Sequence, residues 1–259
     1  MALTPSKVAL VTGASRKAGI GAAIARELAR AGADIFIAYY RPYDQEVGLG
    51  SDPDEPQLLL AELKDMGRRA DGFELDLSDP GAPKSLFDRV EAAMGPVTIL
   101  VNNAVRSLRD GIENLNADHL DRHYALNVRA MALLCAEFVR RYKQNYPEKS
   151  GGRVINLSSG QGLNPMPGEL AYAATKGAVE AFTRSLSAEV ARLGITVNAV
   201  DPGATDTGWI TSGLKERWMA ESPMGRIGVP EDAARLIRFL ASAEAEWITG
   251  QIIHSRGGL

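Results

Sequence analysis

The sequence has few of the residues on which several protein classes depend. Its 259 residues include one cysteine, Cys135, so no disulfide can form within the chain, and a reducing compartment is expected. Cys135 lies in the apolar run 130–136 and is interpreted as a buried hydrophobic residue. The three histidines, His119, His123 and His254, show no metal-site spacing with cysteine or with a shared carboxylate cluster. We therefore expect no catalytic metal.

Long apolar runs and an excess of positive charge are also absent. No N-terminal segment has the apolar core of a signal peptide, and no uninterrupted apolar run is long enough to cross a membrane. The formal net charge of -3 argues against nucleic acid or an anionic membrane as a partner. We expect a soluble, cytoplasmic protein. Because no linker, charge block or repeat divides the chain, residues 1–259 are interpreted as a single domain.

Short β-favouring runs alternate with helical stretches along the whole chain. This alternation is typical of an α/β protein with a doubly wound, parallel sheet of the Rossmann type, and it predicts about seven strands with helices on both faces. Strands are expected near 8–11, 35–40, 72–75, 97–101, 153–157, 195–200 and 250–254. Helices are expected up to 31 after the first strand and near 57–66, 82–94, 117–146, 170–193, 206–220 and 230–242, with a long polar loop at 42–56.

A glycine-rich turn joins the first strand to the first helix. Residues 12–21 read Thr-Gly-Ala-Ser-Arg-Lys-Ala-Gly-Ile-Gly. A strand, a glycine-rich turn and a helix in this order bring backbone N–H groups and a helix N-terminus to a pyrophosphate, and a Cβ would hold the phosphates away. A plain turn between strand and helix is the alternative interpretation, but the context favours nucleotide binding.

The end of the second strand indicates which dinucleotide is bound. In dinucleotide-binding folds an acid at this strand end holds the ribose 2′-hydroxyl, whereas a basic residue accommodates a 2′-phosphate. The strand ends here at Arg41 without such an acid, and Arg41 and Arg16 are candidates to hold the phosphate. NADP(H) is therefore favoured over NAD(H). The alternative is that Arg41 is a solvated loop charge.

A tyrosine and a lysine share one face of the helix expected at 170–193. Tyr172 and Lys176 are four residues apart, and Ser159 follows an apolar strand. A free tyrosine has a pKa near 10, too high for a general base at neutral pH, and a nearby ammonium lowers it by about 1–3 units. A second cation such as oxidised nicotinamide, together with the Ser159 hydroxyl, would supply the rest. A chance pairing on an ordinary amphipathic helix is the alternative.

Together these motifs resemble the classical short-chain dehydrogenase/reductase family over essentially the whole chain. The resemblance is closest to its 3-oxoacyl-(acyl carrier protein) reductase-like members. The matching positions are Thr12, Gly13, Gly19, Gly21, Asp76, Asn102, Asn103, Ala104, Asn127, Ser159, Tyr172, Lys176, Pro202, Gly203, Thr207 and the segments 226–232 and 248–251.

The resemblance implies a role for each of these residues. Tyr172 would be the general acid in reduction and the base in oxidation, and Lys176 would lower its pKa and hold the nicotinamide ribose. Ser159 would orient and polarise the carbonyl, and Asn127 would anchor a water in a proton relay. The residues expected to bind the cofactor are Gly13, Ser15, Arg16, Gly19, Ile20, Gly21, Arg41, Asp76, Leu77, Asn103, Ala104, Tyr172, Lys176, Pro202, Gly203, Thr205 and Thr207.

The resemblance also implies a reaction and an assembly. A hydride would pass between NADP(H) and a substrate carbonyl or secondary alcohol, in a 3-oxoacyl thioester or another ketone. An acyl carrier protein would need a basic patch, for which Arg106 and Arg109 are candidates. Helices 117–146 and 170–193 would pair across an interface in a homotetramer or dimer. A sugar or steroid alcohol dehydrogenase of the same family is the alternative within this chemistry, and a non-catalytic cofactor-sensing protein is the alternative from another class.

Four positions depart from the family pattern. Five residues, 14–18, separate the first two glycines of the turn, where the family usually has three. Val105 replaces a glycine, Asp201 replaces the common asparagine before Pro202, and Arg256 replaces the aspartate before the last two glycines. None of these changes removes a catalytic group, so we expect them to affect cofactor geometry and substrate fit.

Overall fold

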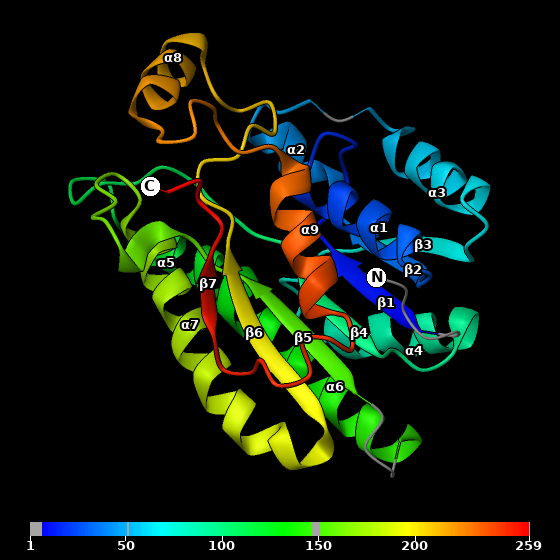
Figure 1. Cartoon of the computed structure of the whole chain (residues 1–259). Coiled ribbons are helices and arrows are strands. Elements are labelled where there is room, and N and C mark those ends of the chain that lie inside the picture. The colour runs from blue at the N-terminus through cyan, green and yellow to red at the C-terminus, as the bar shows by residue number, and fades with distance from the viewer. Residues whose placement is uncertain (1–6, 51, 147–150, 259) are drawn as a thin grey trace.

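Seven parallel strands form one sheet at the centre of the molecule. The computed structural model describes residues 7–50, 52–146 and 151–258. The strand order β3-β2-β1-β4-β5-β6-β7, with helices on both faces, confirms the predicted Rossmann-type fold (Figure 1). The strands are β1 (Val8–Thr12), β2 (Asp34–Tyr39), β3 (Ala70–Glu74), β4 (Ile99–Asn102), β5 (Gly152–Leu157), β6 (Ile195–Asp201) and β7 (Ile252–His254).

Two layers of helices bury the two faces of the sheet. Successive strand residues point to opposite faces, so Ala9 and Val11 of β1 join one core and Val8 and Leu10 join the other. The first core packs against α1 (Ile20–Arg30), α3 (Glu55–Asp65) and α9 (Pro230–Leu240), and the second against α4 (Ala82–Met94), α6 (Met131–Asn145) and α7 (Leu170–Val190). Cys135 is fully buried in the second core, as predicted. None of the helices in the described ranges is long and apolar enough to cross a membrane.

Three segments differ from the sequence prediction. The prediction of a loop at 42–56 is wrong at both ends. Residues 42–46 belong to α2 (Arg41–Glu46), and α3 already begins at Glu55. Pro42 lies in the first turn of α2, where a helix tolerates proline. The long helix expected at 117–146 is divided into α5 (Ala117–Tyr124), a π-helical segment (Ala125–Ala130) and α6. The helix expected from 206 begins only at Ser212, as α8 (Ser212–Glu221), which lies apart from both layers at the top of Figure 1.

The strand order determines where a ligand can bind. The chain runs outward from β1 to β2 and β3, and then returns to place β4 on the other side of β1. Ligands of such sheets bind beyond the carboxyl ends of the strands at this point of reversal. The segments that follow β1, β4, β5 and β6 therefore meet at one edge of the sheet.

Candidate active site

A cavity of about 1170 Å³ lies at this edge of the sheet. Its wall combines the glycine-rich turn, the segments after β3 to β6, and the first turn of α7. Gly21, Arg41, Asn127 and Lys176 are not among the described residues of this wall. The predicted site residues that do line it are Gly13, Ser15, Arg16, Gly19, Ile20, Asp76, Leu77, Asn103, Ala104, Ser159, Tyr172, Pro202, Gly203, Thr205 and Thr207.

The glycine-rich turn presents an open helix end to the cavity. α1 begins at Ile20 after Gly19, no side chain among the described residues caps it, and its first turn has no acidic residue. Its first N–H groups and the positive end of its dipole can therefore bind an anion. Gly13 has a φ of +73°, and a Cβ there would lie 2.7 Å from the Cα of Ala104. This turn fits a pyrophosphate.

The residues after β4 hold the glycine-rich turn in place. Asn103 Nδ2 donates to the carbonyl oxygens of Thr12 and Gly13, each at 2.9 Å. In return, Thr12 Oγ1 accepts from the backbone N–H groups of Asn103 and Ala104, each at 3.0 Å. Asn103 thus uses its side chain to fix the turn while it also contributes to the cavity wall.

The two arginines expected near a 2′-phosphate lie in different surroundings. Arg16 lines the cavity, donates from Nη1 to the carbonyl oxygen of Thr207 at 2.8 Å, and has its Nε 3.3 Å from Asp44 Oδ1. Arg41 binds both carboxylate oxygens of Glu74, which raises the pKa of its guanidinium. Of the two, Arg16 is therefore the one that can meet a ligand in the cavity.

Ser159 and Tyr172 lie at the inner end of the cavity. Ser159 has extended backbone after β5 and precedes a short 3-10 turn. Tyr172 lies in the first turn of α7, whose start is fixed because the buried carboxylate of Asp110 accepts hydrogen bonds from the N–H groups of Leu170 and Ala171. The Ser159 hydroxyl lowers the pKa of Tyr172, but burial of the phenol has the larger effect and raises this pKa to about 12.

Lys176 lies one helical turn beyond Tyr172 and is 4% exposed. Its Nζ donates to the carbonyl oxygen of Leu157 at 2.6 Å and lies 5.6 Å from the centre of the Tyr172 ring. Burial lowers the pKa of Lys176 to about 8, although the nearby Asp201 carboxylate acts in the other direction. In the chain alone burial of the phenol dominates the Tyr172 pKa, and the lowering effect expected of Lys176 stays a prediction.

Asn127 lies in the π-helical segment between α5 and α6, and such segments often mark functional sites. Its Oδ1 accepts from the N–H of Arg106, and its Nδ2 donates to the carbonyl oxygen of Arg106, both at 2.8 Å. Nδ2 also donates to Thr175 Oγ1 at 3.0 Å. Asn127 therefore ties the segment after β4 to the helix that carries Tyr172 and Lys176.

Comparisons with known proteins identify the family. A family model described as "Enoyl-(Acyl carrier protein) reductase" matches residues 13–259. The chain is 50% identical over 258 residues to the uncharacterized oxidoreductase YjdA of Bacillus subtilis, with 100% of this chain and 98% of the relative covered. It is 39% identical over 260 residues to an NADPH-dependent aldehyde reductase-like chloroplastic protein of Arabidopsis thaliana, with 97% and 93% covered. The chain belongs to the short-chain dehydrogenase/reductase family.

A solved structure agrees with this assignment. A short chain dehydrogenase from Burkholderia cenocepacia, in complex with NADP, has a TM-score of 0.86 and 33% identity over 98% of each chain. Short-chain dehydrogenases/reductases transfer hydride between NAD(P) and CH–OH or C=O groups. The chain is therefore an oxidoreductase of the NAD(P)-dependent ketone and aldehyde reductase family. Within the described ranges, no group of three or more histidine, cysteine, aspartate or glutamate side chains could hold a metal ion.

Two departures from the pattern of short-chain dehydrogenases/reductases meet as one ion pair. Asp201, at the end of β6, is 1% exposed, and its Oδ2 lies 3.0 Å from Arg256 Nη1 and 2.9 Å from His254 Nδ1. The Arg256 guanidinium packs on Gly160, where any Cβ would lie only 2.1 Å from Nη1. The ion pair thus links β6 to the last residues of the chain, beside the Ser159 segment.

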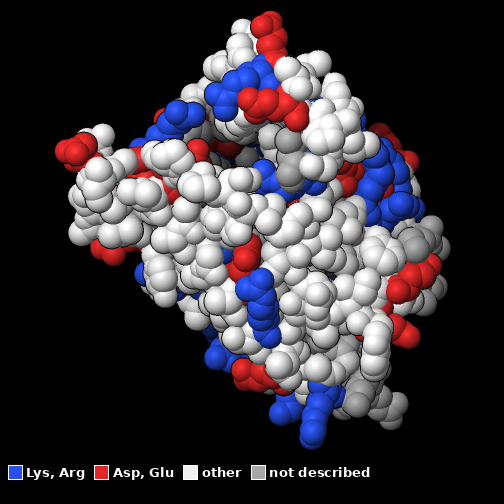
Figure 2. Space-filling view, turned by 60° about the vertical axis from the view of Figure 1, so that its left-hand side comes forward, with Lys and Arg blue, Asp and Glu red and all other residues white. Residues whose placement is uncertain are grey.

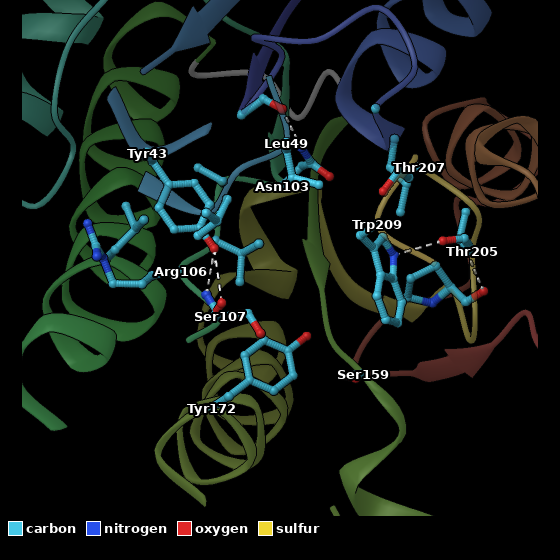
Figure 3. Close-up of a pocket in the computed structure, with 18 of the residues that line it drawn as sticks. Tyr43, Leu49, Asn103, Arg106, Ser107, Ser159, Tyr172, Thr205, Thr207 and Trp209 are labelled. Atoms are coloured by element: carbon cyan, nitrogen blue, oxygen red, sulfur yellow. Dashed lines mark hydrogen bonds between the residues drawn. The ribbon is translucent and has the colours of Figure 1, made fainter. Parts of the chain in front are cut away.

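Two tryptophan side chains form an aromatic part of the cavity wall. Trp209 and Trp218 line the cavity and pack edge to face, with their ring centres 5.7 Å apart. The Nε1 of Trp209 donates to the carbonyl oxygen of Thr205 at 3.1 Å, which fixes the indole (Figure 3). The side chains on this wall can pack against an apolar part of a substrate.

Sequence patterns did not reveal the contribution of α2. Tyr43 and Asp44 line the cavity from the segment expected to be a loop, although Pro42 in a first turn signals a helix start. The Tyr43 hydroxyl accepts from the N–H of Ser107 at 2.9 Å and lies 3.3 Å from its carbonyl oxygen. Figure 3 shows this hydroxyl pointing toward Ser107, on the side of the cavity where Tyr172 lies.

Charged side chains of both signs border the cavity. In Figure 2 the surface is hollowed below its uppermost charged residues, and blue and red side chains lie close together around the hollow. Arg109, Arg217, Glu169 and Glu221 all contribute to the cavity wall. This mixture does not provide the single-sign field that attracts a strongly charged macromolecule.

Proposed function

We propose that this chain is an NADPH-dependent reductase of small aldehydes and ketones. The observation that carries the proposal is that one cavity contains the glycine-rich turn with Arg16 at one end and the Ser159–Tyr172 pair at the other. A dinucleotide along the cavity would connect these two ends. The Arabidopsis relative, named as an NADPH-dependent aldehyde reductase-like protein, supports both the cofactor and the substrate class.

The inner end of the cavity supplies the proton. The cofactor, when bound, supplies the hydride. The Ser159 hydroxyl donates a hydrogen bond to the substrate carbonyl oxygen, and the Tyr172 hydroxyl gives that oxygen its proton. Because burial raises the pKa of Tyr172 to about 12, its hydroxyl is protonated at neutral pH, which is the form that reduction requires.

Lys176 and Asn127 support this proton donor. With a pKa of about 8, Lys176 carries its charge at neutral pH and can donate hydrogen bonds to the hydroxyl groups of the nicotinamide ribose. As Tyr172 gives up its proton, the negative charge that develops on its oxygen would favour the charged form of Lys176. Asn127 keeps the Arg106 backbone and Thr175 in fixed positions through its three hydrogen bonds, and it remains our candidate to anchor a relay water.

The other predicted contacts would hold the rest of the cofactor. We assign the adenine to Asp76 and Leu77, the adenosine side to Asn103 and Ala104, and the nicotinamide border to Pro202, Gly203, Thr205 and Thr207. Arg16 is the residue that we assign to the 2′-phosphate. Arg41 would join it only after leaving Glu74, and Gly21 serves close packing, because a Cβ there would lie 2.4 Å from the carbonyl oxygen of Gly13.

A free carbonyl compound suits this cavity better than an acyl carrier protein. Of the two basic residues expected to form a docking patch, Arg106 pairs with Glu46 at 2.9 Å and lies 5.2 Å from the centre of the Tyr43 ring. Only Arg109 of that pair is exposed. Trp209 and Trp218 offer an apolar surface instead, which favours a substrate with an alkyl or aromatic group beside its carbonyl.

A carbonyl panel tests the proposal. Purified protein is mixed with NADPH, and separately with NADH, in the presence of alkyl and aromatic aldehydes, ketones, a 3-oxoacyl thioester, sugars and steroid ketones, and cofactor absorbance is followed. We expect the fastest turnover with NADPH and a small aldehyde or ketone. Fastest turnover with a sugar or a steroid would select the alternative within the family. Calorimetric cofactor binding without turnover of any compound would overturn the reductase assignment and favour a cofactor-sensing protein.

We also propose that the chain assembles as a homotetramer through α5, α6 and α7. Leu120 and Tyr124 of α5 and Leu170 of α7 are 43%, 55% and 37% exposed, although they are large apolar residues. Such side chains gain most when a second copy covers them. Light scattering after size-exclusion chromatography should give four times the chain mass, and a monomer at micromolar concentration would contradict this assembly.

A further inference from the structure

α2 connects the two rims of the cavity. On one rim, Asp44 pairs with Arg16 in the glycine-rich turn, with Oδ1 3.3 Å from Nε. On the other rim, Tyr43 exchanges hydrogen bonds with Ser107, and Glu46 pairs with Arg106 at 2.9 Å. A helix held at both rims forms part of the cavity wall between them, so a ligand that binds to Arg16 also lies next to Asp44 of α2.

The Asp44 carboxylate contacts the guanidinium of Arg16, which would otherwise be free to bind an anion. It pairs with Arg16, and Ser15 acts with Arg16 to lower the pKa of the carboxyl; both residues belong to the glycine-rich turn. Asp44 is 5% exposed, and its Oδ2 is buried with no hydrogen-bond partner among the described residues. Burial raises the pKa of this carboxyl against the effects of Ser15 and Arg16. A carboxylate with one unsatisfied buried oxygen is costly and therefore readily exchanged for a better anion.

We propose that Asp44 determines how strongly this protein prefers a 2′-phosphate to a 2′-hydroxyl. The proposal rests on the assignment of Arg16 to the 2′-phosphate under the proposed function. Asp44 neutralises Arg16 in the free protein and competes with the incoming phosphate for the guanidinium. When both anions share the site, their like charges repel each other. A 2′-hydroxyl meets no such repulsion and can donate a hydrogen bond to the carboxylate. Asp44 thus lowers the affinity for NADPH relative to NADH.

Binding of two cofactor fragments tests the proposal without any turnover. Adenosine 2′,5′-bisphosphate and adenosine 5′-monophosphate differ only in the 2′-phosphate, and calorimetry measures the Kd of each. We expect Asp44→Asn, which keeps the shape but removes the charge, to tighten binding of the bisphosphate about tenfold and to change binding of the monophosphate less than twofold. Asp44→Ser removes the same charge and replaces the asparagine variant if circular dichroism shows that the latter does not fold.

Glu46→Gln is the matched control, because it removes one negative charge from the same helix but faces Arg106 and Arg122 instead of Arg16. It should leave the ratio of the two affinities unchanged. The proposal would be overturned if, in both Asp44 variants, the affinity for the bisphosphate relative to the monophosphate were unchanged or lowered.

Arg16→Gln separates this failure from a failure of the cofactor assignment. If Arg16→Gln weakens only the bisphosphate while the Asp44 variants change nothing, the phosphate site stands and the role of Asp44 is wrong. If Arg16→Gln leaves bisphosphate binding unchanged, Arg16 does not hold the phosphate, and both assignments fail. In the double variant Arg16→Gln/Asp44→Asn, the effect of Asp44 should disappear, because the two charges act through each other.

Discussion

The two ends of the cavity are held together by different kinds of interaction. At the inner end, Lys176 and Asn127 are buried and hydrogen-bonded to backbone groups of other segments. At the outer end, Arg16 and Arg41 are held by carboxylates, those of Asp44 and Glu74. Groups held by buried backbone contacts need no reorganisation during a reaction. The partly exposed Arg41–Glu74 pair is of a kind that contributes little, and the Arg16–Asp44 pair leaves one buried carboxylate oxygen unsatisfied, so the outer end can give up its internal contacts to a cofactor.

The largest effect is expected from Tyr172→Phe at the inner end. Without the phenolic proton, kcat for carbonyl reduction should fall about 10³-fold, within the range that general acid catalysis contributes. The calorimetric Kd of NADPH should stay within twofold, because the ring remains. Tyr146→Phe, at a residue that follows α6 and is not among those lining the cavity, is the matched control. Turnover retained at more than a tenth of the wild-type rate would show that another group donates the proton.

The second-largest effect is expected from breaking the buried ion pair between Asp201 and Arg256. Arg256→Met removes the guanidinium that neutralises Asp201, which is 1% exposed, and should lower the free energy of unfolding by about 3 kcal/mol in urea titrations. The double variant Asp201→Asn/Arg256→Met should recover most of this loss, because no buried charge remains unpaired. A loss below about 0.5 kcal/mol in the single variant would mean that Arg256 is not needed to stabilise the buried carboxylate, which His254 also contacts.

The pH dependence of kcat/KM for NADPH should follow the protonation state of Lys176. Its lowered pKa of about 8 means that Lys176 is cationic below this pH and neutral above it, whereas Tyr172, with a pKa of about 12, stays protonated throughout. The kcat/KM for NADPH reports groups of the free enzyme and should fall about tenfold per pH unit above this pKa. The same decline should occur with NADH, since Lys176 is not part of the site that we assign to the 2′-phosphate. A flat profile up to pH 10 would contradict this account.

The smallest effect is expected at the outer end. Arg16→Gln should weaken NADPH about fivefold and NADH less than twofold, a loss of about 1 kcal/mol, because Asp44 already offsets part of the Arg16 charge. Arg41→Gln should change neither affinity by more than about twofold, since Glu74 holds this guanidinium. If Arg41→Gln weakened NADPH more than Arg16→Gln, the assignment of the two arginines would be reversed.

The same contrast explains what the sequence could predict. The glycine-rich turn and the Ser159, Tyr172 and Lys176 positions are local patterns whose spacing determines their geometry. The structure brings Gly13, Gly19, Ser159 and Tyr172 into one cavity wall. The alternation of strands and helices likewise predicted the sheet.

The charged partners could not be predicted, because they join residues distant in sequence. Arg41 pairs with Glu74 on the neighbouring strand, and Asp201 pairs with Arg256 near the end of the chain. The direction of the Tyr172 pKa shift depends on burial, which spacing alone does not reveal. The single-domain division and the cytoplasmic location stay predictions.

The most direct test of the central claim is the melting temperature of the wild-type protein with NADPH and with NADH at matched concentrations. A ligand that binds only the folded state stabilises it according to its affinity. We predict a rise with both cofactors and a larger rise with NADPH, because Arg16 can exchange Asp44 for the 2′-phosphate. A larger rise with NADH would contradict the NADPH assignment, and no rise with either cofactor, confirmed by calorimetry, would contradict the account of the cavity itself.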